Sequence, residues 1–142
     1  MSECYKYFKK NMEDFGLAPR PESLFGTQQL AIGTINTILA FIDKFGTKVT
    51  VMEMIGAGTR LEQLAAVGTI GAAYYAGASI GSLAVATGRT ISGGTALADV
   101  MLEASRWRLK RSWLTPLLHR MPGIYDPSVP GRKYYRTYTF TR

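Results

Sequence analysis

The sequence predicts a small, mostly α-helical domain, and three observations support this fold class. Apolar residues recur at helical spacing along much of the chain, and two long stretches, 23–42 and 63–88, contain no charged residue. The basic residues are concentrated near the C-terminal end, where residues 105–142 hold nine lysines and arginines against one acid. A chain of 142 residues is expected to form a single domain, here 1–142.

The N-terminal segment, 1–16, predicts a short amphipathic helix. Its large apolar side chains recur every three or four residues, with lysines between them, and are Tyr5, Phe8, Met12 and Phe15. Because the segment has no apolar core region and no small-residue cleavage site, it is not expected to be a secretory signal peptide. The single cysteine, Cys4, excludes an intramolecular disulfide.

Residues 23–45 predict a first hydrophobic helix. Ser23 is a suitable N-cap, the run stays uncharged as far as Ile42, and Gly46 is suited to end the helix. Glutamines, an asparagine and threonines make this run too polar for a simple lipid anchor. Two interpretations are therefore open: the polar groups line a wet lumen in a membrane assembly, or the segment is an amphipathic core helix.

Residues 63–88 predict a second, longer helix of the glycine-zipper type. The run has 26 uncharged residues. As a helix it would span about 39 Å, which exceeds the hydrocarbon core of a bilayer, about 30 Å. The preceding stretch, 49–59, is rich in β-branched residues but also has helical spacing, so that both strand and helix are open there.

Small residues form stripes along this second helix. One stripe has a small residue at every fourth position, and three further glycines lie in the same run. These residues are Ala65, Thr69, Ala73, Gly77 and Gly81, with Gly68, Gly71 and Gly88. Such stripes let helix backbones approach closely, which drives helix association in lipid, whereas in water each interior glycine costs a helix about 1 kcal/mol relative to alanine. The alternative is a tightly packed helix pair in a soluble bundle.

Residues 95–113 predict an amphipathic basic helix, followed by a basic irregular tail, 114–142, that contains four prolines. The end of the helix, "RWRLKRSW", combines tryptophan with basic residues, namely Arg106, Trp107, Arg108, Lys110, Arg111 and Trp113. This combination is typical of a membrane-interface anchor that contacts anionic lipid. It also fits phosphate contacts on nucleic acid, or a solvated helix end whose tryptophans enter the core.

No arrangement of residues in the sequence indicates catalysis. The one histidine, His119, has no cysteine or serine motif near it, and a single cysteine provides no metal-binding spacing. The protein is therefore not expected to be an enzyme, to hold a metal or to need a cofactor.

The glycine-rich run resembles the glycine-zipper segments of pore-forming toxins. In size and in its mixed soluble and membrane character the chain is similar to pore-forming effectors of the bacterial type VI secretion system, mainly over residues 24–104. The resemblance implies release from the producer cytoplasm without a signal peptide, inside a hexameric ring of haemolysin-coregulated protein. It also implies three further partners, namely a cognate inner-membrane immunity protein, the target-cell membrane and other copies of the chain, and it implies no catalytic residue.

The expected function is therefore that of an interbacterial toxin. It would insert into the inner membrane of the target cell and form a small ion-selective pore, with cations as the expected ions, and so dissipate the membrane potential. This interpretation predicts no nucleic-acid partner. The alternative is a soluble helical module that binds nucleic acid, or acts as an adaptor, through the basic region 105–142.

Overall fold

The computed structural model of the protein describes residues 3–14, 17, 21–91, 96–126 and 129. In chain order its elements are α1 (Glu3–Asp14), α2 (Glu22–Phe25), α3 (Gln28–Phe45), α4 (Val51–Gly56), the 3₁₀ helix η1 (Glu62–Val67), α5 (Ala72–Ile91), α6 (Leu97–Arg106), α7 (Leu114–Arg120) and the 3₁₀ helix η2 (Pro122–Ile124). Within the described residues the β-type pairing is limited to an isolated antiparallel bridge between Thr50 and Gly71. The prediction of a small, mostly α-helical domain is confirmed.

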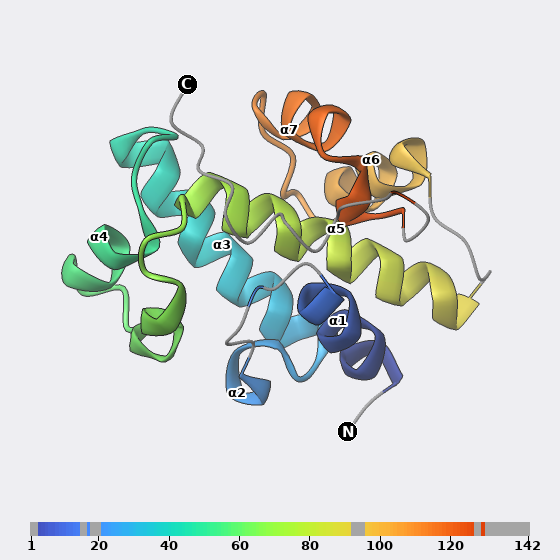
Figure 1. Ribbon diagram of the computed structural model, residues 1–142, viewed down its shortest axis with the longest axis horizontal. Helices are drawn as coiled ribbons and strands as arrows, with labels where there is room; N and C mark the ends of the chain where they lie inside the picture. Colours follow the sequence, from blue (N-terminus) through green and yellow to red (C-terminus); the bar gives the residue numbers. More distant parts are fainter. Residues whose placement is uncertain (1–2, 15–16, 18–20, 92–95, 127–128, 130–142) are drawn as a thin grey trace.

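Helix α5 runs through the middle of the domain (Figure 1). In this view α1 lies below it, and α6 and α7 lie above it. Helices α1, α3, α4, α6 and α7 and the short η2 all contact α5. The core is thus built round one central helix.

The N-terminal helix packs on this centre through aromatic rings. The Phe8 ring of α1 stacks on the Phe25 ring of α2, with centroids 4.9 Å apart. Phe25 in turn lies 6.4 Å from the ring of Tyr75 in α5. The predicted amphipathic helix over 1–16 is present as α1, and residues 15–16 lie outside the described part of the chain.

The first hydrophobic helix, predicted over 23–45, is divided in two. The chain forms the short α2, turns at Gly26 and begins again as α3. The Thr27 hydroxyl accepts a hydrogen bond from the N–H of Leu30 at 3.1 Å. This N-cap satisfies an amide that otherwise lacks a partner at a helix start, and it fixes the new beginning.

Of the two predicted ends of that helix, the N-terminal one is wrong and the C-terminal one is confirmed. Ser23 does not cap α3 but lies within α2, where its hydroxyl donates to Oε1 of Gln63 at 2.7 Å. At the other end α3 stops before Gly46, as predicted, and Gly46 has the left-handed φ of +98° that a glycine adopts without strain.

The single helix predicted over 63–88 is wrong. The chain forms η1, then a turn, and α5 begins only at Ala72. The backbone of residues 68–72 makes three hydrogen bonds of 2.8–3.0 Å with residues 49–52. These groups are therefore satisfied by a distant segment instead of by neighbours one turn along a helix, and the helix is interrupted there.

The stretch 49–59, open between strand and helix, contains the short helix α4. A capping box begins it: the Thr50 hydroxyl accepts from the N–H of Glu53 at 3.2 Å, and Oε1 of Glu53 accepts from the N–H of Thr50 at 2.8 Å. The two reciprocal bonds satisfy two amides at the helix start.

The basic helix predicted over 95–113 ends early. Helix α6 stops at Arg106, and the chain then turns, with Arg108 in the left-handed region at φ +61°. The side chain of Leu109 is fully buried, and its N–H donates to the carbonyl of Ala104 at 2.8 Å. Burying Leu109 directs the chain back to the core and ends the helix before the second tryptophan.

The irregular tail predicted over 114–142 is wrong in its first part, which forms α7 and η2. Pro116 lies in the first turn of α7, and Pro122 begins η2. Proline is tolerated at both places because the first amides of a helix have no partner within it. In the rest of the predicted tail, residues 127–128 and 130–142 lie outside the described part of the chain.

Candidate functional site

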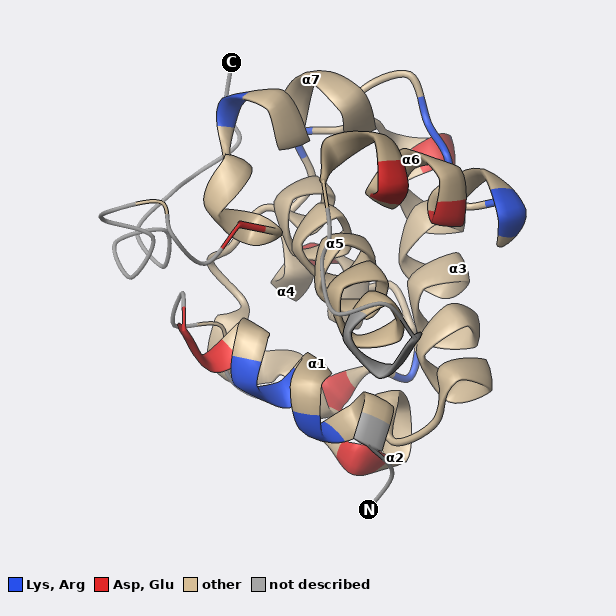
Figure 2. Cartoon of the chain, turned by 90° about the vertical axis from the view of Figure 1, so that its right-hand side faces the viewer, with Lys and Arg blue, Asp and Glu red and all other residues tan. Residues whose placement is uncertain are grey.

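Helix α5, which contains most of the uncharged, glycine-rich run, lies at the centre of the fold. Every residue of α5 from Ala72 to Ala86 is buried, and the helix carries no charged residue before Arg89. Figure 2 shows charged residues on the elements around it, among them α1 and α6. A helix that is apolar on all sides is suited to a protein core or to a membrane, and in this structure it occupies a core.

Two glycines of α5 are covered by the C-terminal helices. A Cβ at Gly77 would overlap the side chain of Leu117 in α7, and a Cβ at Gly81 would overlap Ile124 in η2. Leu117 and Ile124 are themselves fully buried. The glycines thus form a shallow groove along α5 that apolar side chains of the same chain fill.

Three residues of the predicted five-residue stripe lie together on α5. They are Ala73, Gly77 and Gly81, all of them buried. The other two are separated from them, because Ala65 lies in η1 and Thr69 in the turn that follows, and both are exposed. The prediction of one continuous stripe is therefore wrong in its first half, for the reason that interrupts the helix.

The three further glycines of the run have local roles. Gly68 faces Met52, whose Cε would lie 2.5 Å from an added Cβ. Gly71 forms the bridge to Thr50. Gly88 is half-buried near the end of α5. Gly68 and Gly71 therefore hold the turn before α5 against α4 and do not form a contact between helices of a zipper.

A buried polar contact that the sequence analysis missed joins three elements at this groove. Nδ2 of Asn11 in α1 donates to Oγ of Ser82 in α5 at 2.9 Å and to the carbonyl of Ile124 at 2.7 Å. Asn11 is only 4% exposed. Its position three residues after Phe8, on the apolar face of the N-terminal helix, is the signal that could have identified it.

The cysteine lies at the same interface. Cys4 in α1 is half-buried. Burial raises the pKa of the Cys4 thiol, and the side chain of Thr87 in α5 has a smaller, opposing effect. Since the thiolate is the reactive form, this thiol is suited to packing.

Acids of the same chain neutralise part of the predicted basic cluster. The guanidinium of Arg111 contacts Asp43 near the end of α3 at two points, with Nε 2.9 Å from Oδ1 and Nη2 2.9 Å from Oδ2. Nη1 of Arg106 lies 3.1 Å from Oε1 of Glu103, one turn earlier in α6. Arg111 therefore connects the segment before α7 to α3, whereas Arg106 is paired within its own helix.

The remaining residues of the cluster divide between core and surface. Trp107 and Trp113 are half-buried and pack against the hydrophobic core. Arg108 and Lys110 are exposed and form no ion pair with a described residue. The free cationic surface is thus smaller than the six-residue pattern predicts.

No three side chains of His, Cys, Asp or Glu in the described ranges are gathered as metal ligands would be. No helix in the described part of the chain combines the length and the apolar character that crossing a membrane requires.

Comparison with family models, with curated proteins and with solved structures gives no match for this chain. The most distinctive feature of the chain itself is the covered glycine groove of α5.

Proposed function

We propose that the protein is an antibacterial toxin that permeabilises the inner membrane of a target cell, and that the fold described above is its stored form. In the stored form α5 is held inside the domain. In the active form α5 leaves its covering helices, enters the bilayer and associates with the α5 helices of other copies. The expected product is a small ion-selective pore, with cations as the expected ions.

The observation that carries the proposal is the covered glycine groove. Close approach of two α5 helices requires the face that holds Gly77 and Gly81. In the stored form Leu117 and Ile124 occupy that face. Covering by the same chain and association with another copy are therefore mutually exclusive, which gives the chain a way to stay monomeric until the C-terminal helices move.

The length of α5 matches a bilayer core, and its polarity fits an assembly better than a single span. Its 20 residues make a helix about 30 Å long, and a bilayer core is about 30 Å thick. Its glycines, serines and tyrosines make it less apolar than a lone span needs. In a group of helices the small and polar faces turn toward one another and toward a lumen.

The proposal includes the partners that the resemblance implies: the hexameric carrier ring, the immunity protein of the producer and the target membrane. A nucleic-acid partner fits less well. Arg106 and Arg111 are paired with acids of the chain, and phosphate binding depends on cations that are free to replace counterions.

A reversible cross-link between α5 and η2 tests the proposal. A Cβ at Gly81 would lie 3.7 Å from Cβ of Ile124, and a disulfide needs about 3.5–4.5 Å. The pair Gly81→Cys and Ile124→Cys, in a Cys4→Ser background, should therefore form a disulfide that holds the C-terminal helices on α5. Vesicles of phosphatidylethanolamine and phosphatidylglycerol with a potassium gradient and a voltage-sensitive dye report the ion flux.

The native protein should depolarise these vesicles, the oxidised variant should not, and reduction should restore the flux. The Cys4→Ser protein under the same oxidant is the matched control. Absence of any flux from the native protein would contradict the membrane function. Equal flux from the oxidised and the reduced variant would contradict the release of α5.

A further inference from the structure

An exposed aromatic surface lies at the C-terminal end of α3. Phe45 is 55% exposed, and its ring centroid lies 4.6 Å from that of the half-buried Phe41, one turn earlier. Nζ of Lys44 lies 5.3 Å from the Phe45 ring centroid. We call Phe41, Lys44 and Phe45 the α3 tip.

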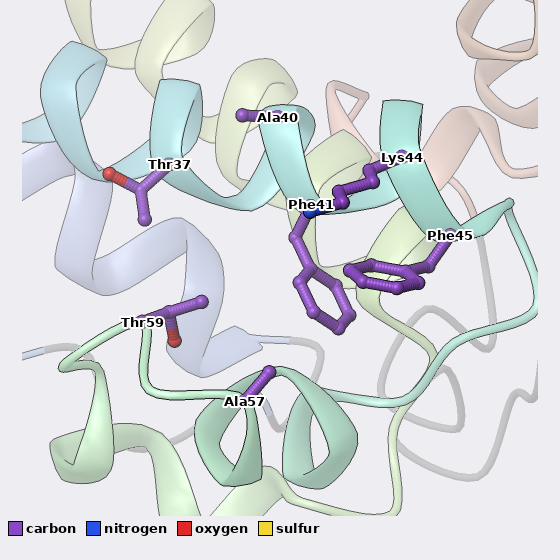
Figure 3. Close-up of a pocket in the computed structure, with 7 residues that line it drawn as sticks. All are labelled: Thr37, Ala40, Phe41, Lys44, Phe45, Ala57 and Thr59. Atoms are coloured by element: carbon purple, nitrogen blue, oxygen red, sulfur yellow. The ribbon is translucent and has the colours of Figure 1, made fainter.

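The α3 tip forms one wall of a groove of about 470 Å³. The rings of Phe41 and Phe45 extend from α3 toward Ala57, and Thr37 and Thr59 lie at the other side (Figure 3). The hydroxyl of Thr37 donates to the carbonyl of Gly33 at 3.1 Å, and that of Thr59 donates to the carbonyl of Met54 at 3.0 Å. The threonine donors are thus used internally, which leaves the groove mainly apolar.

The charge of this surface is positive. Lys44 and, in the loop that follows, Lys48 are exposed and form no ion pair with a described residue. The neighbouring acid, Asp43, is held by Arg111 at 2.9 Å. No acid lines the groove.

The α3 tip is also close to the start of the buried helix. The chain continues from Phe45 through a short loop to Thr50, which bridges to Gly71 directly before α5. The carbonyl of Val49 accepts from the N–H of Ala72 at 2.8 Å. The α3 tip is therefore joined to the first turn of α5 by a short loop and these backbone contacts.

We infer that the α3 tip is the surface through which the protein first contacts an anionic lipid membrane. Phenylalanine is among the apolar residues that interfacial helices bury at the boundary of headgroups and acyl chains, and lysine is attracted by anionic headgroups. An open groove with a protruding ring suits partial insertion between lipids. This inference rests on the proposed function and adds to it the place where docking begins.

Vesicle co-sedimentation of the full chain tests the inference, with phosphatidylcholine vesicles compared with vesicles that also contain phosphatidylglycerol. The variants are Phe45→Ser, Lys44→Gln and, as the matched control, Leu102→Ser. Leu102 is 60% exposed on α6, so its change removes an equally accessible apolar side chain elsewhere. Thermal unfolding of each variant checks that the fold is kept.

Phe45→Ser should weaken binding to the anionic vesicles about tenfold, since an aromatic side chain no longer enters the interface. Lys44→Gln should weaken it about threefold to fivefold on anionic vesicles and leave binding to neutral vesicles unchanged. Leu102→Ser should bind as the native protein does.

Binding of Phe45→Ser at the native level overturns the inference, as does an equal loss with Leu102→Ser. The same holds if the native protein does not sediment with anionic vesicles, in which case a protein partner becomes the occupant to seek. The proposed function fails separately, when the native protein binds the vesicles but causes no ion flux.

Discussion

Helices α3 and α5 are alike in composition but differ in what surrounds their glycines. Both are rich in small residues, and neither has a charged residue over most of its length. A Cβ at Gly77 or Gly81 of α5 would overlap Leu117 or Ile124, whereas a Cβ at Gly33 of α3 would meet nothing within 4 Å. The same residue type thus permits close packing in one helix and stands at an exposed surface in the other.

The two helices differ in how much of their surface the rest of the chain covers. α5 is covered on all sides from Ala72 to Ala86, so its groove is accessible only after the fold opens. α3 buries one face and presents the other, which ends in the exposed ring of Phe45. The spacing of small residues alone therefore does not tell whether that face of a helix is covered or exposed, because the neighbouring elements decide it.

Enlarging a glycine should have the largest effect on stability, with opposite signs in the two helices. Gly77→Leu should lower the free energy of unfolding by about 3 kcal/mol, because the new side chain overpacks against Leu117. Gly33→Leu should raise it by about 0.5 kcal/mol, since the helix loses a glycine and nothing is displaced. Urea unfolding followed by circular dichroism measures both.

Equal stability of these two variants would show that the covering of α5 is loose. The Gly77→Leu variant also tests the proposed pore. The variant keeps the apolar character of α5 but prevents close approach of two α5 helices. Ion flux at the native level, measured in vesicles with a potassium gradient, would therefore mean that close packing at the glycines is not the basis of the proposed activity.

Removing a buried amide should have the next largest effect. Asn11→Ala should cost about 2–3 kcal/mol, because the buried carbonyl of Ile124 and the hydroxyl of Ser82 lose the same donor. The matched change on the exposed face of α3, Asn36→Ala, should leave stability within about 0.5 kcal/mol of the native value. Chemical unfolding distinguishes the two, and a similar small change for both would mean that Asn11 does not hold α1, α5 and η2 together.

The ion pair at the end of α3 should have the smallest effect. Arg111→Gln should cost about 0.5–1 kcal/mol in dilute buffer and less in 1 M salt, since the partners Arg111 and Asp43 are both partly exposed. A double-mutant cycle with Asp43→Asn measures the coupling. Coupling that does not fall with salt would mean that the pair is more shielded than its exposure indicates.

Helical spacing alone predicted the fold class and much of the first helix. The apolar positions of α1 repeat at three and four residues, so local helix geometry places them on one face, independently of the rest of the chain. The end of α3 before Gly46 was predictable for a similar reason, because glycine ends a helix by a local preference of its own backbone.

The candidate site was only half predictable. Ala73, Gly77 and Gly81 lie on one helix as their spacing indicates, but Ala65 and Thr69 do not. The six-residue basic cluster was predicted as one helix end, yet Arg111 turns to Asp43 and the half-buried tryptophans pack against the core. Each departure depends on a partner that is distant along the chain.

The sequence by itself determined that this chain is helical, that two stretches avoid charge and that one of them is rich in glycine, because these are properties of composition and local spacing. Only the tertiary structure decided that the helix over 63–88 is interrupted and that α5, and not α3, fills the centre. The physical reason is that backbone groups of residues 68–72 bond to residues 49–52, while Leu117 and Ile124 fill the groove at Gly77 and Gly81. Contacts between segments that are distant in the chain leave no periodic pattern in the segments they join.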